Sequence, residues 1–135
     1  MTEELAGPGR EPVRDFLEEV KETITNPATR YDGWLLVRRL ESAECIAELG
    51  YTFADVREAI LGLSVADYCS GPLRDRDMPG NLWVFGKVIQ GKEVYIKLKL
   101  AKVGPMKRVR IVSFHFAEEP LSYPYGPEEE KKGGT

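Results

Sequence analysis

The stretch EVYIKLKLAKVGPMKRVRIVSFH, residues 93–115, decides the expected fold because it holds two strand-like runs around a Gly-Pro turn. Alternation of apolar and polar residues is typical of a β-strand that buries one face. In the first run the apolar residues that should pack on a core are Val94, Ile96, Leu98 and Leu100. The opposite face of the same strand carries Tyr95, Lys97 and Lys99. The short connection predicts that the two strands pair antiparallel.

The second run is apolar almost without interruption from Val109 to Phe114. Such a run is typical of a central strand covered on both faces. Its basic residues gather at the start of the run, at Lys107, Arg108 and Arg110. The run ends in His115, the only histidine of the chain.

Further strands are expected upstream of this pair. LWVFGKVI (82–89) predicts a strand that the turn QGK (90–92) joins to the next one as a hairpin. ADYCSG (66–71) is a weaker strand candidate, and GPLRDRDMPGN (71–81) is expected to be a loop because Pro and Gly punctuate it.

Helices are expected in the first half of the chain, where apolar residues recur at spacings of three and four. The first should run from near Pro12 to about Ile24. ESAECIAELG (41–50) predicts a second helix that ends at a left-handed Gly50, and Thr52 with Asp55 predicts the start of a third. GWLLVRRL (33–40) predicts a short strand or an extended segment. The fold class is therefore α+β, with N-terminal helices packed on a small antiparallel β-sheet.

The length of 135 residues favours one domain. We expect a disordered N-terminus over residues 1–10, a single domain over 11–117 and a flexible C-terminal tail over 118–135. No apolar run approaches the roughly 20 residues that span a bilayer, and the polar N-terminus lacks the apolar core of a signal peptide. We therefore expect a cytoplasmic protein. Cys45, Cys69 and one histidine lack zinc-site spacing, so neither a metal nor a cofactor is expected.

Charge is distributed unevenly along the chain. Residues 82–114 contain eight basic residues and one acidic residue, although the whole chain has 19 basic and 22 acidic residues. One interpretation is a surface that binds the phosphates of RNA or DNA. The other is a solvated sheet face whose lysines prevent edge-to-edge aggregation. The candidate RNA-binding residues are Lys87, Lys99, Arg74, Arg76 and Trp83.

Each candidate also has a structural interpretation. Arg74 and Arg76 could simply pair with Asp75 and Asp77, and Trp83 could be a core residue. A lone histidine at the end of a strand is more often structural than catalytic, although its ordinary pKa suits proton transfer at neutral pH.

The order LGLSVADY, then Trp83, then GKVIQGKEVYIKLKL, then RIVSFH resembles the MqsR family of bacterial toxins. These toxins are RelE-like endoribonucleases of type II toxin–antitoxin systems, and the similarity covers roughly residues 13–116. The resemblance places Tyr95, Lys97 and His115 at the positions that line the cleavage site of the family. It also implies a RelE-like fold, mRNA as substrate and a cognate antitoxin of the zinc-finger and helix-turn-helix type.

The chain departs from the family pattern near the expected site. Cys69 and Ser70 stand where the family has an aromatic residue and a lysine, and Val84 replaces a glutamine. Arg74 or Arg76 is a candidate to supply the missing cation. The leading hypothesis is metal-independent RNA cleavage by attack of the ribose 2′-OH on the adjacent phosphate, with His115, Tyr95 and Lys97 as catalytic residues. The alternatives are a non-catalytic RNA- or ribosome-binding module and a basic face that docks a protein partner.

Overall fold

A computed structural model of the chain describes residues 8–29 and 33–126. Three helices precede most of the sheet: α1 (Arg10–Thr25), α2 (Leu40–Leu49) and α3 (Phe53–Leu61). Two single 3₁₀ turns follow α1 and α3: η2 (Pro27–Thr29) and η3 (Val65–Asp67). None of the helices in this part of the chain is long and apolar enough to cross a membrane.

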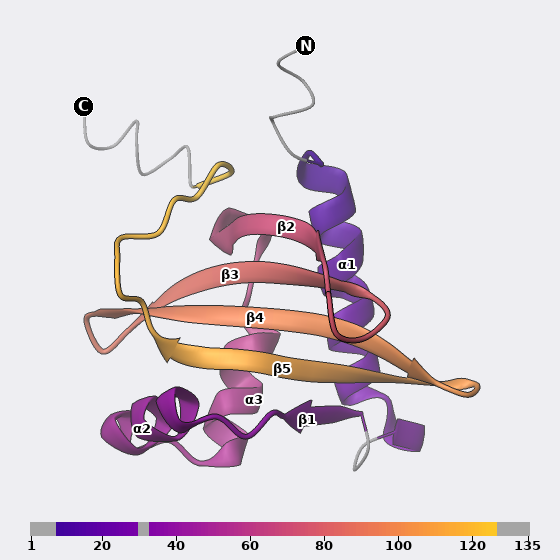
Figure 1. Cartoon of the computed structure of the whole chain (residues 1–135), viewed down its shortest axis with the longest axis horizontal. Coiled ribbons are helices and arrows are strands. Elements are labelled where there is room, and N and C mark those ends of the chain that lie inside the picture. Colours follow the sequence, from indigo (N-terminus) through magenta and orange to yellow (C-terminus); the bar gives the residue numbers. More distant parts are fainter. Residues whose placement is uncertain (1–7, 30–32, 127–135) are drawn as a thin grey trace.

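Five strands form one mixed sheet in the order β1-β5-β4-β3-β2 (Figure 1). They are β1 (Trp34–Leu36), β2 (Tyr68–Arg74), β3 (Asn81–Ile89), β4 (Lys92–Val103) and β5 (Met106–Phe116). Strand β1 pairs parallel with β5, and the other three pairings are antiparallel. The α+β class is thus confirmed, but the expected purely antiparallel sheet is wrong at β1. A three-residue apolar strand carries no signal for its pairing direction.

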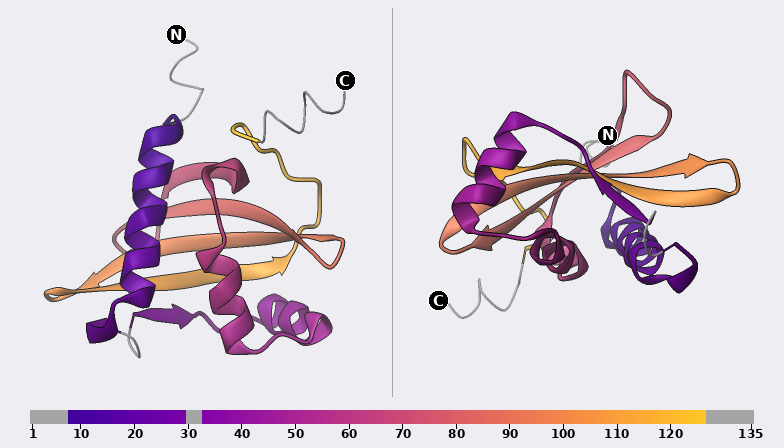
Figure 2. Two further views of the ribbon diagram at one scale, coloured as in Figure 1. Left: turned by 180° about the vertical axis from the view of Figure 1, so that it is seen from behind. Right: turned by 90° about the horizontal axis from the view of Figure 1, so that it is seen from below.

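Helices α1 and α3 lie on the same face of the sheet, and α2 lies beside the C-terminal half of β5 (Figure 2). The apolar stripe expected on the first helix is confirmed, since its residues all belong to the core: Val13, Phe16, Leu17, Val20 and Ile24. From β4, Val94, Ile96 and Leu98 are fully buried against these helices, as the alternation predicts. The Ser42 hydroxyl of α2 accepts a hydrogen bond from the Phe114 backbone N–H, so α2 continues the edge of β5 where β1 has ended.

The ends of the helices confirm the expected caps. Gly50 follows α2 in the left-handed conformation with φ of 71°, which costs a glycine little. Thr52 and Asp55 form a reciprocal capping box at the start of α3. These caps fix the short connection between α2 and α3.

Strand β5 contains a bulge that accounts for its long apolar run. Lys97 pairs with Ser113 and Leu98 pairs with Ile111, so Val112 is an extra residue on β5. Val109 and Ile111 before the bulge and Phe114 after it are therefore all buried in the core, although simple alternation would place Phe114 on the opposite face. The expectation that β5 is covered on both faces holds only in part, because on the face opposite the helices Ser113 is 3% exposed but Arg110 is half-buried.

The segment after β5 is not a loose tail over the described residues. Both carboxylate oxygens of Glu93 accept hydrogen bonds from it: Oε1 from the Leu121 backbone N–H at 3.1 Å and Oε2 from the Tyr123 hydroxyl at 2.8 Å. Tyr125 then stacks on Tyr68 at 5.4 Å, and its hydroxyl accepts a hydrogen bond from the Gly9 backbone N–H. Residues 1–7 and 127–135, for which disorder or flexibility was expected, lie outside the described residues.

Candidate nucleic-acid interface

The face of the sheet opposite α1 and α3, called the open face below, has three rows of residues across the strands. It is only partly open: Leu121 and Tyr123 cover it at Gly86, and Val84, Lys99 and Ser113 are each 3% exposed. One row contains Leu82, Lys99 and Arg110. The next contains Ser70, Val84, Lys97 and Ser113, and the third contains Gly86, Tyr95 and His115. Successive rows are two residues apart, which is about 7 Å along a strand. Tyr95, Lys97 and Lys99 thus share one face, as the sequence predicts.

A groove of about 400 Å³ lies on the open face, between the β2–β3 loop and the strands. Six basic and two acidic residues line it: Arg39, Arg74, Arg76, Lys97, Lys99 and Arg110, with Asp75 and Asp77. We call it the cationic groove. Among the described residues, no carboxylate pairs with Arg74, Arg76, Lys97 or Arg110. The expected pairing of Arg74 and Arg76 with their neighbouring aspartates does not occur.

Lys99 has a structural partner. Its ammonium contacts the Asp75 carboxylate at 2.8 Å, and only 4% and 17% of the two side chains are exposed. The same carboxylate accepts hydrogen bonds from the backbone N–H groups of Asp77 and Met78. The Lys99 hydrogen bond is the main reason that the pKa of Asp75 falls to about 2. Lys99 therefore anchors the loop that presents Arg74 and Arg76. Its ammonium is already paired with Asp75, and its role as an RNA contact stays a prediction.

Tyr95 and His115 face each other across β4 and β5. Their rings stack at 5.0 Å with an interplanar angle of 10°, and the Lys97 ammonium lies 5.9 Å from the centre of the Tyr95 ring. The Nδ1 atom of His115 lies 3.0 Å from the carbonyl oxygen of Phe116. Because a carbonyl can only accept, Nδ1 carries the proton, and Nε2 of the neutral ring is free to accept one. Burial, and then the nearby Cys69, raise the pKa of Tyr95, so its hydroxyl stays protonated at neutral pH.

The surroundings of His115 are acidic on one side. It lines a hollow of about 210 Å³ together with four glutamates, three of them on α2: Glu41, Glu44, Glu48 and Glu118. The cationic groove does not include His115. The three residues expected to be catalytic are neighbours, but the histidine stands at the border between a basic and an acidic surface. The sequence held a signal for this, since the glutamates recur on one side of the helix expected over 41–50.

Two predicted RNA-binding residues lie on the other face of the sheet. Trp83 stacks on Phe16 of α1 at 4.5 Å, which makes it part of the helix–sheet contact. Lys87 stands opposite the fully buried Val94, so it lies at the rim of the helix-covered face. Strand alternation puts Trp83, Phe85 and Lys87 on the same side, so neither Trp83 nor Lys87 lines the cationic groove, and RNA binding by either stays a prediction. The structural interpretation of Trp83 is confirmed.

The two cysteines and the possible metal ligands add no reactive group to the site. Cys45 and Cys69 are free thiols, and burial is the main cause that raises their pKa values to about 11 and about 12. Both thiols therefore stay protonated at neutral pH. Within residues 8–29 and 33–126, no three His, Cys, Asp or Glu side chains form a group that could hold a metal ion.

Comparisons with models of known protein families, with curated proteins and with solved structures give no match. The description of the fold and of its open face therefore depends on the structure alone. The resemblance to MqsR toxins remains a prediction from the motifs.

The structure adds one detail to that resemblance. Two of the three departures from the family pattern, Ser70 and Val84, pair directly with each other, and Val84 pairs with Lys97. They fall in one row, beside the lysine that the resemblance makes catalytic. Arg74 and Arg76 enter the same groove as Lys97 from the neighbouring loop.

Proposed function

We propose that the protein is an endoribonuclease of the RelE-like toxin type that binds an RNA strand along its cationic groove. The observation that carries the proposal is the position of Lys97. It lies one row from Arg110 and one row from the stacked Tyr95 and His115, so a single phosphate at Lys97 would be within reach of both sets. The surrounding cations would hold the neighbouring phosphates.

Cleavage in this proposal follows the internal route open to RNA. The ribose 2′-oxygen bonds to the adjacent phosphorus while the bond from phosphorus to the 5′-oxygen breaks, leaving a 2′,3′-cyclic phosphate and a 5′-hydroxyl. Nε2 of His115 takes the proton of the 2′-OH. The leaving 5′-oxygen receives a proton from the Tyr95 hydroxyl or, where Tyr95 only orients the phosphate, from the imidazolium that His115 has become. Lys97, with Arg76 or Arg110, stabilises the extra negative charge of the phosphorane. No step in this scheme calls for a metal ion.

The test is incubation of the purified protein with a structured RNA in excess EDTA, with the ends of the products identified. We expect cyclic-phosphate ends from the parent protein and a loss of at least 100-fold in rate for His115→Ala and for Lys97→Ala. Tyr95→Phe keeps the stacked ring and should lose about tenfold, since only the hydroxyl is removed. Cleavage that needs added divalent ions, or His115→Ala cutting at the parent rate, contradicts the proposal.

A second candidate is a non-catalytic RNA- or ribosome-binding module. The four glutamates that line the hollow beside His115 favour it, because they would repel a phosphate at the histidine. The exposed Ser70, in place of a family lysine, favours it as well. Salt-sensitive binding of RNA that stays at full length, with every variant, would support this function over the nuclease.

The resemblance also leads us to propose a cognate antitoxin of the zinc-finger and helix-turn-helix type, and a cytoplasmic site of action. A small Cys-rich protein encoded next to this chain would be the first candidate. Co-expression should then relieve any growth arrest that this chain alone produces. If the neighbouring protein neither binds the chain nor changes its effect on growth, the antitoxin proposal fails while the nuclease proposal stands.

A further inference from the structure

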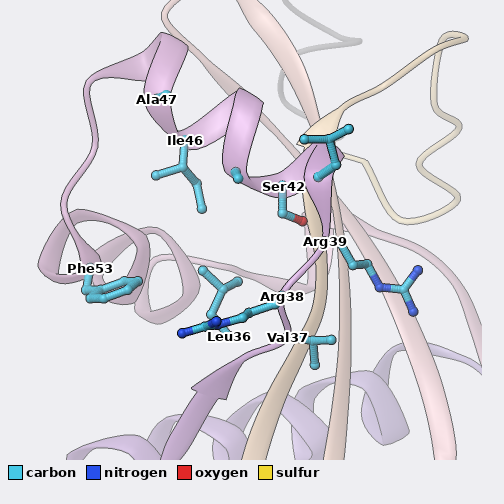
Figure 3. Close-up of a pocket in the computed structure, with 10 residues that line it drawn as sticks. Leu36, Val37, Arg38, Arg39, Ser42, Ile46, Ala47 and Phe53 are labelled. Atoms are coloured by element: carbon cyan, nitrogen blue, oxygen red, sulfur yellow. The ribbon is translucent and has the colours of Figure 1, made fainter.

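A second groove lies near the free edge of the sheet, between β1, α2 and the start of α3 (Figure 3). It measures about 710 Å³. We propose that it docks a short segment of another protein, one in which apolar side chains stand next to acidic ones. This inference goes beyond the proposed nuclease function and does not depend on it. We call the hollow the apolar groove.

The apolar groove arises from small residues on α2. Ala43 and Ala47 lie one helical turn apart and leave a space that larger side chains would fill. Around it, Leu40 is 72% exposed and Phe53 is 68% exposed, whereas the core leucines and phenylalanines are buried. Large apolar side chains gathered at a concave surface are typical of a protein-binding site.

The strand beside the apolar groove has an unused edge. Strand β1 is the last strand of the sheet, and no described strand pairs with its outer side. Gly33 and Val37 direct their backbone groups to β5, through hydrogen bonds with Val109 and Ile111. By alternation, the backbone groups of Trp34 and Leu36 point outward. A protein segment could use them as hydrogen-bonding partners, as peptides do when they add to a sheet edge.

The positive charges at the rim of the apolar groove indicate that its partner carries acidic side chains. Arg38 and Arg39 both line the apolar groove, and they extend in opposite directions, Arg38 across the hollow toward the side of Phe53 (Figure 3). No described carboxylate forms an ion pair with either guanidinium. The glutamates of α2 line the other hollow, beside His115. An occupant with acidic side chains next to its apolar anchors is therefore complementary to this rim.

Two other occupants fit less well. The first is a terminal segment of this chain, but the described residues begin and end near β2, at the opposite edge of the sheet from β1 (Figure 1). RNA bases would need rings to stack on, but among the described residues that line the groove Phe53 is the only aromatic one. Six of its lining residues are aliphatic: Leu36, Val37, Leu40, Ala43, Ile46 and Ala47. Aliphatic side chains of a protein partner match that lining.

The test is selection from a library of random 12-residue peptides displayed on phage, with the whole chain as bait. Synthetic peptides carrying the enriched motif are then titrated by fluorescence anisotropy. We expect a motif of Leu, Ile or Phe next to Asp or Glu. Ala47→Glu fills the groove and repels acidic side chains, and Arg38→Glu reverses the rim charge, so each should weaken peptide binding at least tenfold.

Ala54→Glu is the matched control, because Ala54 is exposed on α3 and does not line the groove. It should leave peptide binding within twofold of the parent. The proposal is overturned if no acidic-apolar motif is enriched, or if Ala47→Glu and Arg38→Glu bind the peptides as the parent does. A 12-nucleotide single-stranded RNA that loses affinity with Ala47→Glu, but not with Lys97→Gln, would instead assign the groove to nucleobases.

Discussion

The two faces of strand β4 obey different physical rules although their residues alternate along one segment. On the helix-covered face, Val94, Ile96 and Leu98 are all fully buried and are fixed by the volume they fill. On the open face, neighbouring lysines differ completely. Lys99 is 3% exposed and paired with Asp75, whereas no described carboxylate pairs with Lys97. Alternation thus determines which face a residue occupies. Whether a lysine on that face forms an ion pair depends on a carboxylate from a loop distant in sequence, here Asp75.

The largest expected effect is on the helix-covered face. Phe85 is fully buried and contacts the rings of Phe16 and Tyr68. Phe85→Ala should lower the free energy of unfolding by about 3–5 kcal/mol, because it leaves a cavity between α1 and the sheet. Val88→Ala, at a position 64% exposed, should change it by no more than about 0.5 kcal/mol. Urea denaturation measures both, and equal losses would show that the helices do not cover this face.

The next effect concerns the segment that crosses the sheet after β5. A Cβ atom at Gly86 would collide with the Tyr123 hydroxyl and with the Leu121 side chain. Gly86→Ala should therefore displace this segment and lower the free energy of unfolding by about 1–3 kcal/mol. Cleavage of the chain between residues 117 and 126 by limited proteolysis should become faster. Gly62→Ala controls for a general effect of losing a glycine, because φ there is −87° and the nearest atom to a new Cβ lies 3.4 Å away.

A smaller effect is expected on RNA affinity, and it distinguishes a lysine on the open face from one on the helix-covered face. Lys97→Gln should raise the Kd for single-stranded RNA about fivefold at 0.1 M salt and lower the slope of log K against log salt by about 0.7, as expected for one lost phosphate contact. Lys87→Gln makes the same chemical change on the same sheet, but at the rim of the other face. It should leave the affinity unchanged. Equal effects of the two substitutions would mean that RNA does not use the open face.

Local patterns predicted much of this fold from the sequence. The helices, their caps and the strand alternation depend on neighbours within four residues, so Gly50, Thr52 and Ile96 behave as expected. The pairing of β1 with β5 was not accessible, because three apolar residues do not specify a partner. The extent of β2 was also missed: it runs to Arg74, through the Gly-Pro pair that was expected to start a loop.

The candidate site was predictable to a smaller extent. Placing Tyr95 and Lys97 together needed only alternation, and the same rule puts Lys87, two residues after the buried Phe85, on the other face. The pairing of Lys99 with Asp75 joins residues 24 apart through a folded loop, and nothing in the local pattern indicates it. The acidic hollow at His115 depends on how α2 packs beside β5, which is a tertiary property.

The smallest expected effect tests the loop anchor through its pH dependence. The pKa of Asp75 is lowered from 3.8 to about 2, first by the hydrogen bond from Lys99. A carboxyl group whose pKa is lowered by folding stabilises the folded state fully above its ordinary pKa and loses that contribution as it is protonated. The stabilisation from Asp75 is therefore present at pH 5 and above and disappears as the pH falls from about 4 to about 2.

Asp75→Asn should remove this component, so that the difference in unfolding free energy between parent and variant is largest near pH 6 and shrinks through that acid window. Asp77→Asn is the control, since this neighbouring carboxylate has no ion pair among the described residues. Because the same ion pair holds Arg74 and Arg76 over the cationic groove, Asp75→Asn should also weaken RNA binding at pH 7, although it removes a negative charge. Tighter binding would mean that the charge of Asp75 matters more than the loop it anchors, and the role assigned to Lys99 would then have to be withdrawn.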